Sequence, residues 1–343
     1  MIRPLLWVAG AGLVLGITGF FLLTGPVNMT GKSTPEEAYF RIEKGMTLRQ
    51  VARDLYRQGY IRHAQAFVIA ARLTGRTEDI RAGFYTIPDN LTVLDLLNRF
   101  AEGEVITRQV TIPEGLTARR MAGLLKKRLG IDSLEFMQLF SDRDLLKRYG
   151  IPAPTFEGYL LPETHEYQLG VSASEVFTSL VEAALKVWED STLTEALTRM
   201  KITRHQALTM ASIVEGEARL PHERTIISGL YWNRIKRNMQ LQADPTIQYL
   251  IKNGPRRVLY KDLEVDSPYN TYKYRGLPPG PVNNPGRDAI VAALNPDRHD
   301  FIFMVADGHG GHVFTRTLSE HAVAKDRYDK IMAPRRKELR KKQ

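Results

Sequence analysis

The sequence of 343 residues contains no cysteine. It therefore forms no disulfide bond and has no thiol to carry a lipoprotein anchor, which fits a disulfide-free protein outside the cytoplasm. Histidine is also scarce, with eight residues. His309, His312 and His321 lie near one another in the chain, but their spacing matches no standard set of zinc ligands. We therefore predict no metal and no cofactor.

Only one long hydrophobic run is free of charge. Residues 5–23 have Thr18 as their only clearly polar side chain, and at ~1.5 Å per residue such a helix covers most of a ~30 Å hydrocarbon core. The run is longer than the ~7–15 residues of a signal-peptide core, and Pro26 stands where a cleavage site is expected. These features favour an uncleaved signal anchor over a cleaved signal peptide. The flanking charges give almost no indication of orientation.

The formal net charge is +10, and the basic tail at 334–343 accounts for half of this excess. The sequence shows no helix-turn-helix, zinc finger or aromatic RNA-binding motif. A solvated tail that touches anionic lipid or wall polymer is therefore favoured over a nucleic-acid-binding arm. We predict no nucleic-acid partner.

A short motif recurs three times in the first half of the chain, at 42–47, 87–92 and 112–117. Each copy ends in Thr and is followed by an amphipathic pattern, which predicts a strand end, a turn, a Thr N-cap and a helix. The first unit resembles a LysM motif, a fold that binds peptidoglycan in many wall proteins. Whether these units bind glycan or are strand-turn-helix units without a ligand stays open.

The best candidate for chemistry is Glu215, near the end of a predicted helix. Thr203 and Gln206 form a capping box, and apolar residues follow at helical spacing. Glu215 lies at the edge of this apolar face, where desolvation favours the protonated form that a general acid needs, although a solvent-facing Glu is the alternative. Glu217 is two residues further along the helix, so its side chain points ~200° around the helix axis from that of Glu215. The two acids therefore do not form the close carboxylate pair of a retaining glycosidase.

The segments that follow this helix are rich in hydroxyl, amide and aromatic side chains. Residues 240–246, 267–272 and 276–286 contain many Tyr, Asn, Thr, Gly and Pro residues, which excludes regular helices or central strands. We interpret them as ordered loops that suit a glycan, which offers hydroxyl groups and apolar ring faces.

Taken in order, the motifs resemble one family, the membrane-anchored endolytic murein transglycosylases, also called MltG or YceG-like proteins. Gly216 departs from the family, which often carries a side chain between the two glutamates. The matching segments are Glu157–Thr164, Ala211–Glu217, Asn233–Arg234, Leu241–Thr246, Tyr269–Tyr272, Gly276–Gly286 and Phe303–Gly308.

The resemblance implies a lyase that cleaves the β-1,4 bond between N-acetylmuramic acid and N-acetylglucosamine in nascent peptidoglycan strands. Glu215 would protonate the glycosidic oxygen and then deprotonate the C6 hydroxyl, which leaves a 1,6-anhydro end and terminates the strand. It also implies a single-pass inner-membrane protein with a periplasmic catalytic domain and a peptidoglycan synthase as partner.

The expected fold class is α+β, with a transmembrane helix, LysM-like units and a mostly helical catalytic domain with a β portion. Helices are expected within 133–188, from about 222 to 237 and at 321–332, and strands at 301–305 and 313–315. The expected parts are a cytoplasmic end at 1–4, an anchor at 5–23, a linker at 24–37, repeats at 38–130, the catalytic domain at 131–333 and the tail at 334–343.

Other residues are candidates for supporting roles, each with a structural alternative. Glu217 either organises the site or is a surface acid, and Asn233 either holds Glu215 or substrate or bonds a loop. Asp244 is best explained as the N-cap of a helix that begins at Pro245. The remaining candidates are Gln242 and Thr246; Tyr269, Asn270, Thr271 and Tyr272 as sugar contacts; Asn283 and Asn284 as acetamido ligands or turn residues; and Glu157 and Glu163 as cleft-shaping residues or a second carboxylate.

Two other functions remain possible from the sequence. One is a peptidoglycan hydrolase that uses water and a base such as Glu157 or Glu163. The other is a non-catalytic wall-binding scaffold built on the repeats.

Overall fold

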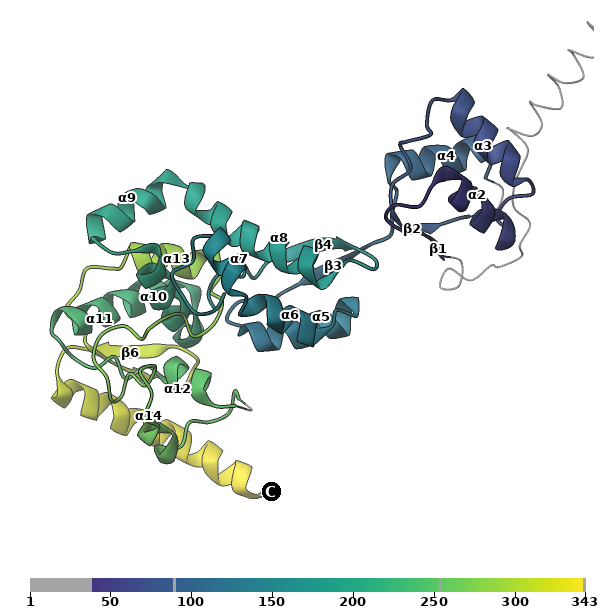
Figure 1. Cartoon of the computed structure of the whole chain (residues 1–343). Coiled ribbons are helices and arrows are strands. Elements are labelled where there is room, and N and C mark those ends of the chain that lie inside the picture. The colour runs from purple at the N-terminus through teal and green to yellow at the C-terminus, as the bar shows by residue number, and fades with distance from the viewer. Residues whose placement is uncertain (1–38, 89–90, 253, 342–343) are drawn as a thin grey trace, which may run out of the picture. The chain divides into compact units, whose positions relative to one another are not determined.

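The computed structural model describes residues 39–88, 91–252 and 254–341 (Figure 1). The predicted anchor and linker lie outside these residues, and no helix within them is long and apolar enough to cross a membrane. The chain divides into two compact units. One contains the described residues up to Gln109 together with Glu166–Val171, and the other contains Val110–His165 and the chain from Ser172 onward.

The first unit contains the first two repeats. Its elements are β1 (Tyr39–Ile42), α2 (Leu48–Arg57), α3 (Ala64–Leu73), β2 (Gly83–Thr86) and α4 (Val93–Glu102). β1 and β2 are antiparallel, with Tyr39 opposite Thr86. Thr47 and Thr92 cap α2 and α4 in complete capping boxes, so the predicted Thr N-caps and the helices that follow them are confirmed in the first two repeats. The core of this unit includes Phe40, Phe67, Tyr85 and Phe100.

The third repeat belongs to the second unit and differs in its cap. Its helix is α5 (Ala118–Leu129), and Thr117 at its N-cap makes no side-chain cap bond. The carboxylate of Glu157 takes this role, because Oε1 accepts the backbone N–H of Ala118 over 3.0 Å. The preceding strand β3 (Thr107–Thr111) pairs with β4 (Thr164–Gln168) in a two-stranded sheet.

Helices make up most of the second unit, and α10 (Arg204–Glu217) lies among them (Figure 1). All residues from Ala207 to Val214 are buried, because α11, α12 and α13 pack around this helix. The predicted capping box of Thr203 and Gln206 is present. The other helices are α6 (Ser133–Phe140), α7 (Arg143–Arg148), α8 (Ala173–Lys186), α9 (Ser191–Met200), α11 (Arg224–Lys236), α12 (Asp244–Leu250), α13 (Arg287–Leu294) and α14 (Leu318–Lys341).

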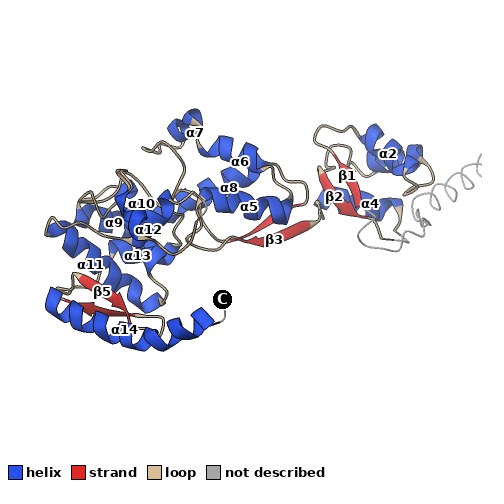
Figure 2. Cartoon of the chain, turned by 90° about the horizontal axis from the view of Figure 1, so that it is seen from below, coloured by secondary structure: helices blue, strands red, loops and turns tan. Residues whose placement is uncertain are grey.

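The predicted C-terminal hairpin is confirmed. Strands β5 (Phe303–Ala306) and β6 (His312–Thr315) are antiparallel, with Phe303 opposite Thr315. Helix α14 packs along this hairpin (Figure 2). The described part of the chain is therefore a mixed fold of many helices and small two-stranded sheets, as expected at this coarse level.

Candidate active site

Glu217, the last residue of α10, has one oxygen engaged and one open. Its Oε1 accepts the hydroxyl of Tyr231 over 3.0 Å and the backbone N–H of Asp244 over 3.2 Å. Within the described residues, Oε2 accepts no hydrogen bond. A proton carried on Oε2 is therefore available to a bound molecule.

The protonation of Glu217 is suited to acid chemistry at neutral pH. Burial raises the pKa of Glu217 to about 7, and the neighbouring carboxylate of Asp244 adds to the rise. The hydroxyl of Tyr231 acts in the opposite direction, because its hydrogen bond favours the charged form and lowers the pKa. A large share of Glu217 is thus protonated near neutral pH.

Glu217 borders a pocket of about 690 Å³, which we call the acid pocket. Its walls come from the end of α10, the start of α12, the glycine-rich tip of the β5–β6 hairpin and α14, and they include Asp244, Gly311 and Tyr328. The pocket therefore places a carboxyl of raised pKa next to space that a ligand can fill.

Glu215 lies in a different environment, and both of its oxygens face donors. Oε2 accepts the backbone N–H of Gly286 over 3.2 Å, and Oε1 is 3.6 Å from Nη2 of Arg224. The side chain is 7% exposed. Burial raises the pKa of Glu215, the carboxylate of Glu114 adds to the rise, and Gly286 and Arg224 lower it.

Glu114 and Arg224, which were not among the predicted site residues, complete this cluster. Nη2 of Arg224 lies 3.1 Å from Oε2 of Glu114, so it contacts both carboxylates. Glu114 follows Pro113 in the third repeat, where the other copies have Lys44 or Asp89. The acidic residue at this position of the repeat was the available sequence signal for Glu114. No local sequence pattern indicated a role for Arg224.

Asn284 and Glu157 form a structural clamp. Oδ1 of Asn284 accepts the backbone N–H groups of Gly158 and Leu160 over 2.8 and 3.1 Å. Its Nδ2 donates to the carbonyl of Leu116 and to Oε1 of Glu157 over 3.0 and 2.7 Å. Every hydrogen-bonding position of this buried amide is used, so Asn284 holds the loops of the site together.

Asn283 has one half of its amide unused. Its Nδ2 donates to the carbonyl of Ser212 over 2.8 Å, while Oδ1 is buried without a hydrogen-bond partner among the described residues. The residue lines a second pocket of about 510 Å³, together with Glu157. Burial raises the pKa of Glu157 to about 7.

Asp244 does not have the predicted capping role. Helix α12 begins at Asp244, its N-cap is Ala243, and no side chain caps it. The expectation is wrong because the carboxylate of Asp244 accepts the hydroxyl of Tyr272 over 2.6 Å, while its backbone N–H bonds Glu217. Asp244 and Tyr272 thus lie at the rim of the Glu217 site.

Three other predicted residues are buried in contacts that shape the loops. Thr246 and Thr271 join their hydroxyls over 2.9 Å, and Thr271 also accepts the backbone N–H of Ala243. Asn270 donates to the carbonyls of Leu263 and Val265. These side chains position the segments around α12.

Gln242, Tyr269 and Glu163 are more exposed. The backbone N–H of Gln242 donates to the carbonyl of Thr271. The ring of Tyr269 packs 5.0 Å from that of Tyr249, and burial raises the pKa of Tyr269. The side chain of Glu163 is exposed.

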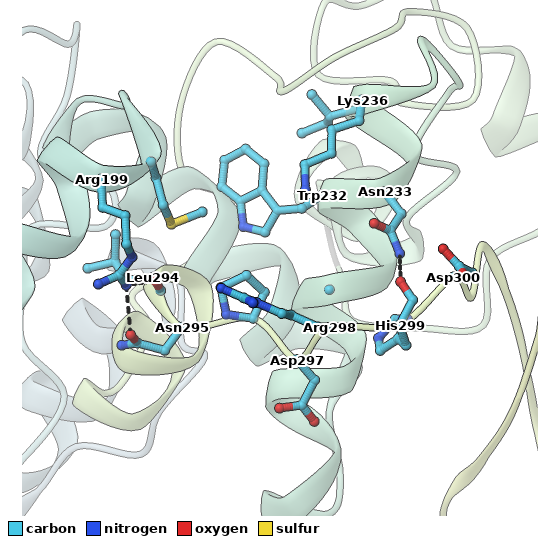
Figure 3. A pocket seen from close by; sticks show the side chains of 14 residues that line it. Arg199, Trp232, Asn233, Lys236, Leu294, Asn295, Asp297, Arg298, His299 and Asp300 are labelled. Carbon is cyan, nitrogen blue, oxygen red and sulfur yellow. Dashed lines mark hydrogen bonds between the residues drawn. The ribbon is translucent and has the colours of Figure 1, made fainter.

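Asn233 lies on the rim of a separate pocket of about 1130 Å³ (Figure 3). Its amide donates to the carbonyls of His299 and Phe301 over 2.6 and 3.2 Å. The structure therefore uses Asn233 to hold the loop after α13, and the acid pocket does not include it.

The histidines of the hairpin do not gather into a cluster. Nδ1 of His312 pairs with Glu223 over 2.7 Å. Within residues 39–88, 91–252 and 254–341, no group of three or more His, Cys, Asp and Glu is suited to hold a metal.

Comparison with known proteins gives one consistent result. The model of the YceG-like family matches residues 40–327. The endolytic murein transglycosylase of Bacillus subtilis (strain 168) is 31% identical over 336 residues, which cover 92% of this chain and 91% of that protein. The enzyme of the same name from Streptococcus pneumoniae (strain D39) is 28% identical, and the match covers 83% of this chain and 58% of that protein.

A solved structure is also similar. The crystal structure of a yceG-like protein from Listeria monocytogenes has a TM-score of 0.58 and 30% identity, and the match covers 83% of this chain and 97% of that one.

Proposed function

This chain belongs to the YceG-like family, and we propose that it is a lytic murein transglycosylase that cuts peptidoglycan strands with Glu217 as acid and then as base. The class of enzyme rests on the relatives that bear this name. The observation that carries the assignment of the acid is the open Oε2 of Glu217 beside a pocket.

The reaction begins with proton transfer from Oε2 of Glu217 to the oxygen between C1 of N-acetylmuramic acid and C4 of N-acetylglucosamine. As this bond breaks, the carboxylate of Glu217 accepts the proton of the C6 hydroxyl of the same muramic residue. O6 then bonds to C1, which gives the 1,6-anhydro ring. No water is consumed, and Glu217 ends in its starting protonation state.

The contacts of Glu217 support both steps. The hydroxyl of Tyr231 and the backbone N–H of Asp244 stabilise the carboxylate that forms after the first transfer. Burial keeps the pKa high enough, at about 7, for the proton to be present at the start.

Glu215, the acid favoured by the sequence, fits this role less well. Both of its oxygens face donors, and the acid pocket is lined by Gly216 and Glu217 but not by Glu215. We assign to Glu215 the joining of α10 to Arg224 and to the loop before α13. A single acid is sufficient for this reaction, so no second carboxylate is required.

We extend the proposal to the setting of the enzyme. Residues 5–23 would anchor it in the inner membrane, with the catalytic unit in the periplasm beside a peptidoglycan synthase. There it would end nascent strands as they are made. Protease accessibility of the C-terminal region in spheroplasts tests this orientation, because a cytoplasmic catalytic unit would stay protected.

The central experiment compares Glu217→Gln with Glu215→Gln in the full-length protein. Uncross-linked glycan strands are treated with each, and the products are weighed by mass spectrometry. The wild type should release internal fragments with anhydro ends, Glu217→Gln should lose about 10²–10⁴-fold in rate, and Glu215→Gln should retain cleavage.

Three results would change the proposal. Loss of cleavage in Glu215→Gln alone would return the acid role to Glu215. Products one water heavier would mean a hydrolase. Binding of glycan without any cleavage by the wild type would support a scaffold.

A further inference from the structure

The pocket of about 510 Å³ that contains Asn283 and Glu157, the basic pocket, is not needed for the proton transfers above. We propose that it binds the acidic peptide stem that the muramic residue carries on its lactyl group. This inference rests on the proposed function and names the part of the substrate that this second pocket takes.

The two pockets adjoin each other. The basic pocket and the acid pocket share Gly216, Pro245 and Gln248 as lining residues. Gly216 packs directly on Pro245, since a Cβ at this position would lie 2.6 Å from that ring. This contact separates the two pockets, so a substituent of a sugar in the acid pocket needs to extend only past Gly216 and Pro245 to reach the basic pocket.

The charge of the pocket fits an anionic ligand. Arg119, Arg120 and Lys252 line it, and within the described residues none of the three forms an ion pair with a carboxylate. Both arginines lie in the first turn of α5, where the helix dipole also favours negative charge. The single acid of the lining is Glu157.

Glu157 leaves most of this positive charge uncancelled, because it is one carboxyl group against three cations. Its Oε1 is held by the backbone N–H of Ala118 and the amide of Asn284. Free carboxylates of a peptide stem are therefore the natural partners of the three cations.

Asn283 adds a position for an N–H group. The carbonyl of Ser212 can only accept, so it fixes Nδ2 of Asn283 toward it and leaves Oδ1 as the unpaired atom. The residue is 5% exposed, and a buried carbonyl oxygen without a donor is costly. Peptide N–H groups would supply the missing donor after a small shift of the loop.

The remaining lining suits small aliphatic groups. Met137, Phe140, Tyr249 and Ile251 face the same pocket. A chain of small residues with free carboxylates matches this combination of cations, one open acceptor and apolar walls. A sugar would meet the apolar walls and the acceptor but would leave the cations without a partner.

The test uses one glycan in two forms, uncross-linked strands with their stems and the same strands stripped of stems by an amidase. Kinetics of anhydro-end formation are measured for the full-length wild type and for the double variant Arg119→Ala/Arg120→Ala. We expect the wild type to have the higher kcat/KM on stem-bearing strands. In the double variant, the ratio of kcat/KM on stem-bearing strands to kcat/KM on stripped strands should be about tenfold lower than in the wild type. Most of this change should come from a higher KM for the stem-bearing strands.

The matched control is Lys126→Ala/Lys127→Ala, which removes the same charge from exposed positions of the same helix outside the pocket. This variant should keep the wild-type ratio. An equal loss in both double variants would assign the effect to net charge and overturn the inference.

Other outcomes are also decisive. Equal kcat/KM of the wild type on both strands, or an equal loss in Arg119→Ala/Arg120→Ala on both, would show that the pocket takes glycan or no substrate at all. In contrast, a wild type that produces no anhydro ends from either strand would contradict the proposed function itself.

A second readout does not depend on cleavage. The released stem peptide is titrated into Glu217→Gln by calorimetry, and into the same protein with Arg119→Ala/Arg120→Ala. We expect binding in the first and a loss of about tenfold or more in the second. Absence of binding in both would contradict the inference even if cleavage occurs.

Discussion

The hydroxyl of Tyr231, on α11, donates to Oε1 of Glu217 across 3.0 Å. This bond favours the carboxylate and lowers the pKa of Glu217, against the rise caused by burial. The pKa of Glu217 therefore results from two opposing effects, burial and the hydrogen bond from Tyr231.

The first prediction concerns the pH profile of the wild type. The pKa of Glu217 is raised to about 7, and the acid must be protonated to start the reaction. The kcat/KM should therefore fall above pH about 7, by tenfold per pH unit, as measured by release of anhydro ends. A profile that is flat to pH 9 would exclude Glu217 as the acid.

The second prediction is the effect of Tyr231→Phe. Loss of the hydroxyl removes a bond that favours the charged form, so the pKa of Glu217 should rise and the alkaline limb should move to higher pH. The maximal kcat should fall about tenfold, because the carboxylate formed in the reaction loses a donor. A loss of rate without any shift of the limb would indicate a structural role only.

The third prediction concerns Arg224→Ala. Removal of the guanidinium leaves the carboxylates of Glu114 and Glu215 together without a cation, so the variant should lose about 2 kcal/mol of stability at pH 8. The pKa of Glu215 is already raised and should rise further, so the deficit should grow from pH 5 to pH 8. Urea unfolding at both pH values measures it.

Glu215→Gln in the Arg224→Ala background is the control. The added substitution removes the buried charge and should restore most of the stability at pH 8. No recovery would mean that Arg224 stabilises the fold through its packing instead.

The fourth prediction is the pH dependence introduced by Glu157. Its pKa is raised by burial from 4.5 in the unfolded chain to about 7 in the folded one. The folded state therefore binds more protons between these values, and stability decreases as pH rises through this window. Glu157→Gln keeps an acceptor for Ala118 and should gain on the order of 3 kcal/mol relative to the wild type between pH 4.5 and 7.

The measurement is the difference in unfolding free energy between Glu157→Gln and wild type across that pH range. A difference that does not change with pH would mean that Glu157 is already ionised at low pH.

The fifth prediction is Asn284→Ala. The substitution leaves the buried N–H groups of Gly158 and Leu160 without an acceptor, so it should cost about 3 kcal/mol or more. Asn295→Ala, at the exposed C-cap of α13, should cost less than about 1 kcal/mol. Thermal unfolding of the two variants compares them directly, and equal losses would contradict the clamp.

Local features of the fold were predictable because their causes lie within a few residues. The capping boxes of Thr47, Thr92 and Thr203 and the C-terminal hairpin follow from short patterns. Thr117 shows the limit of this reasoning, since its repeat has the same pattern but Glu157, distant in the sequence, caps the helix.

The choice between Glu215 and Glu217 could not be made from helical periodicity. Helix α10 is buried on all sides from Ala207 to Val214, so the apolar residues define no single face. The side on which a pocket opens is decided by α12 and the β5–β6 hairpin, which come from far along the chain. The contact of Arg224 with Glu114 joins residues 110 positions apart and left no local pattern.

The clamp at Asn284 also bears on how the protein is made. Its four side-chain bonds close loops of 124, 126, 127 and 168 residues, so each brings together parts of the chain that leave the ribosome at very different times. Contacts of such sequence separation form slowly, because loop closure must precede them. The nascent chain can fold its first repeats early, but it acquires a complete site only after residue 284 has emerged.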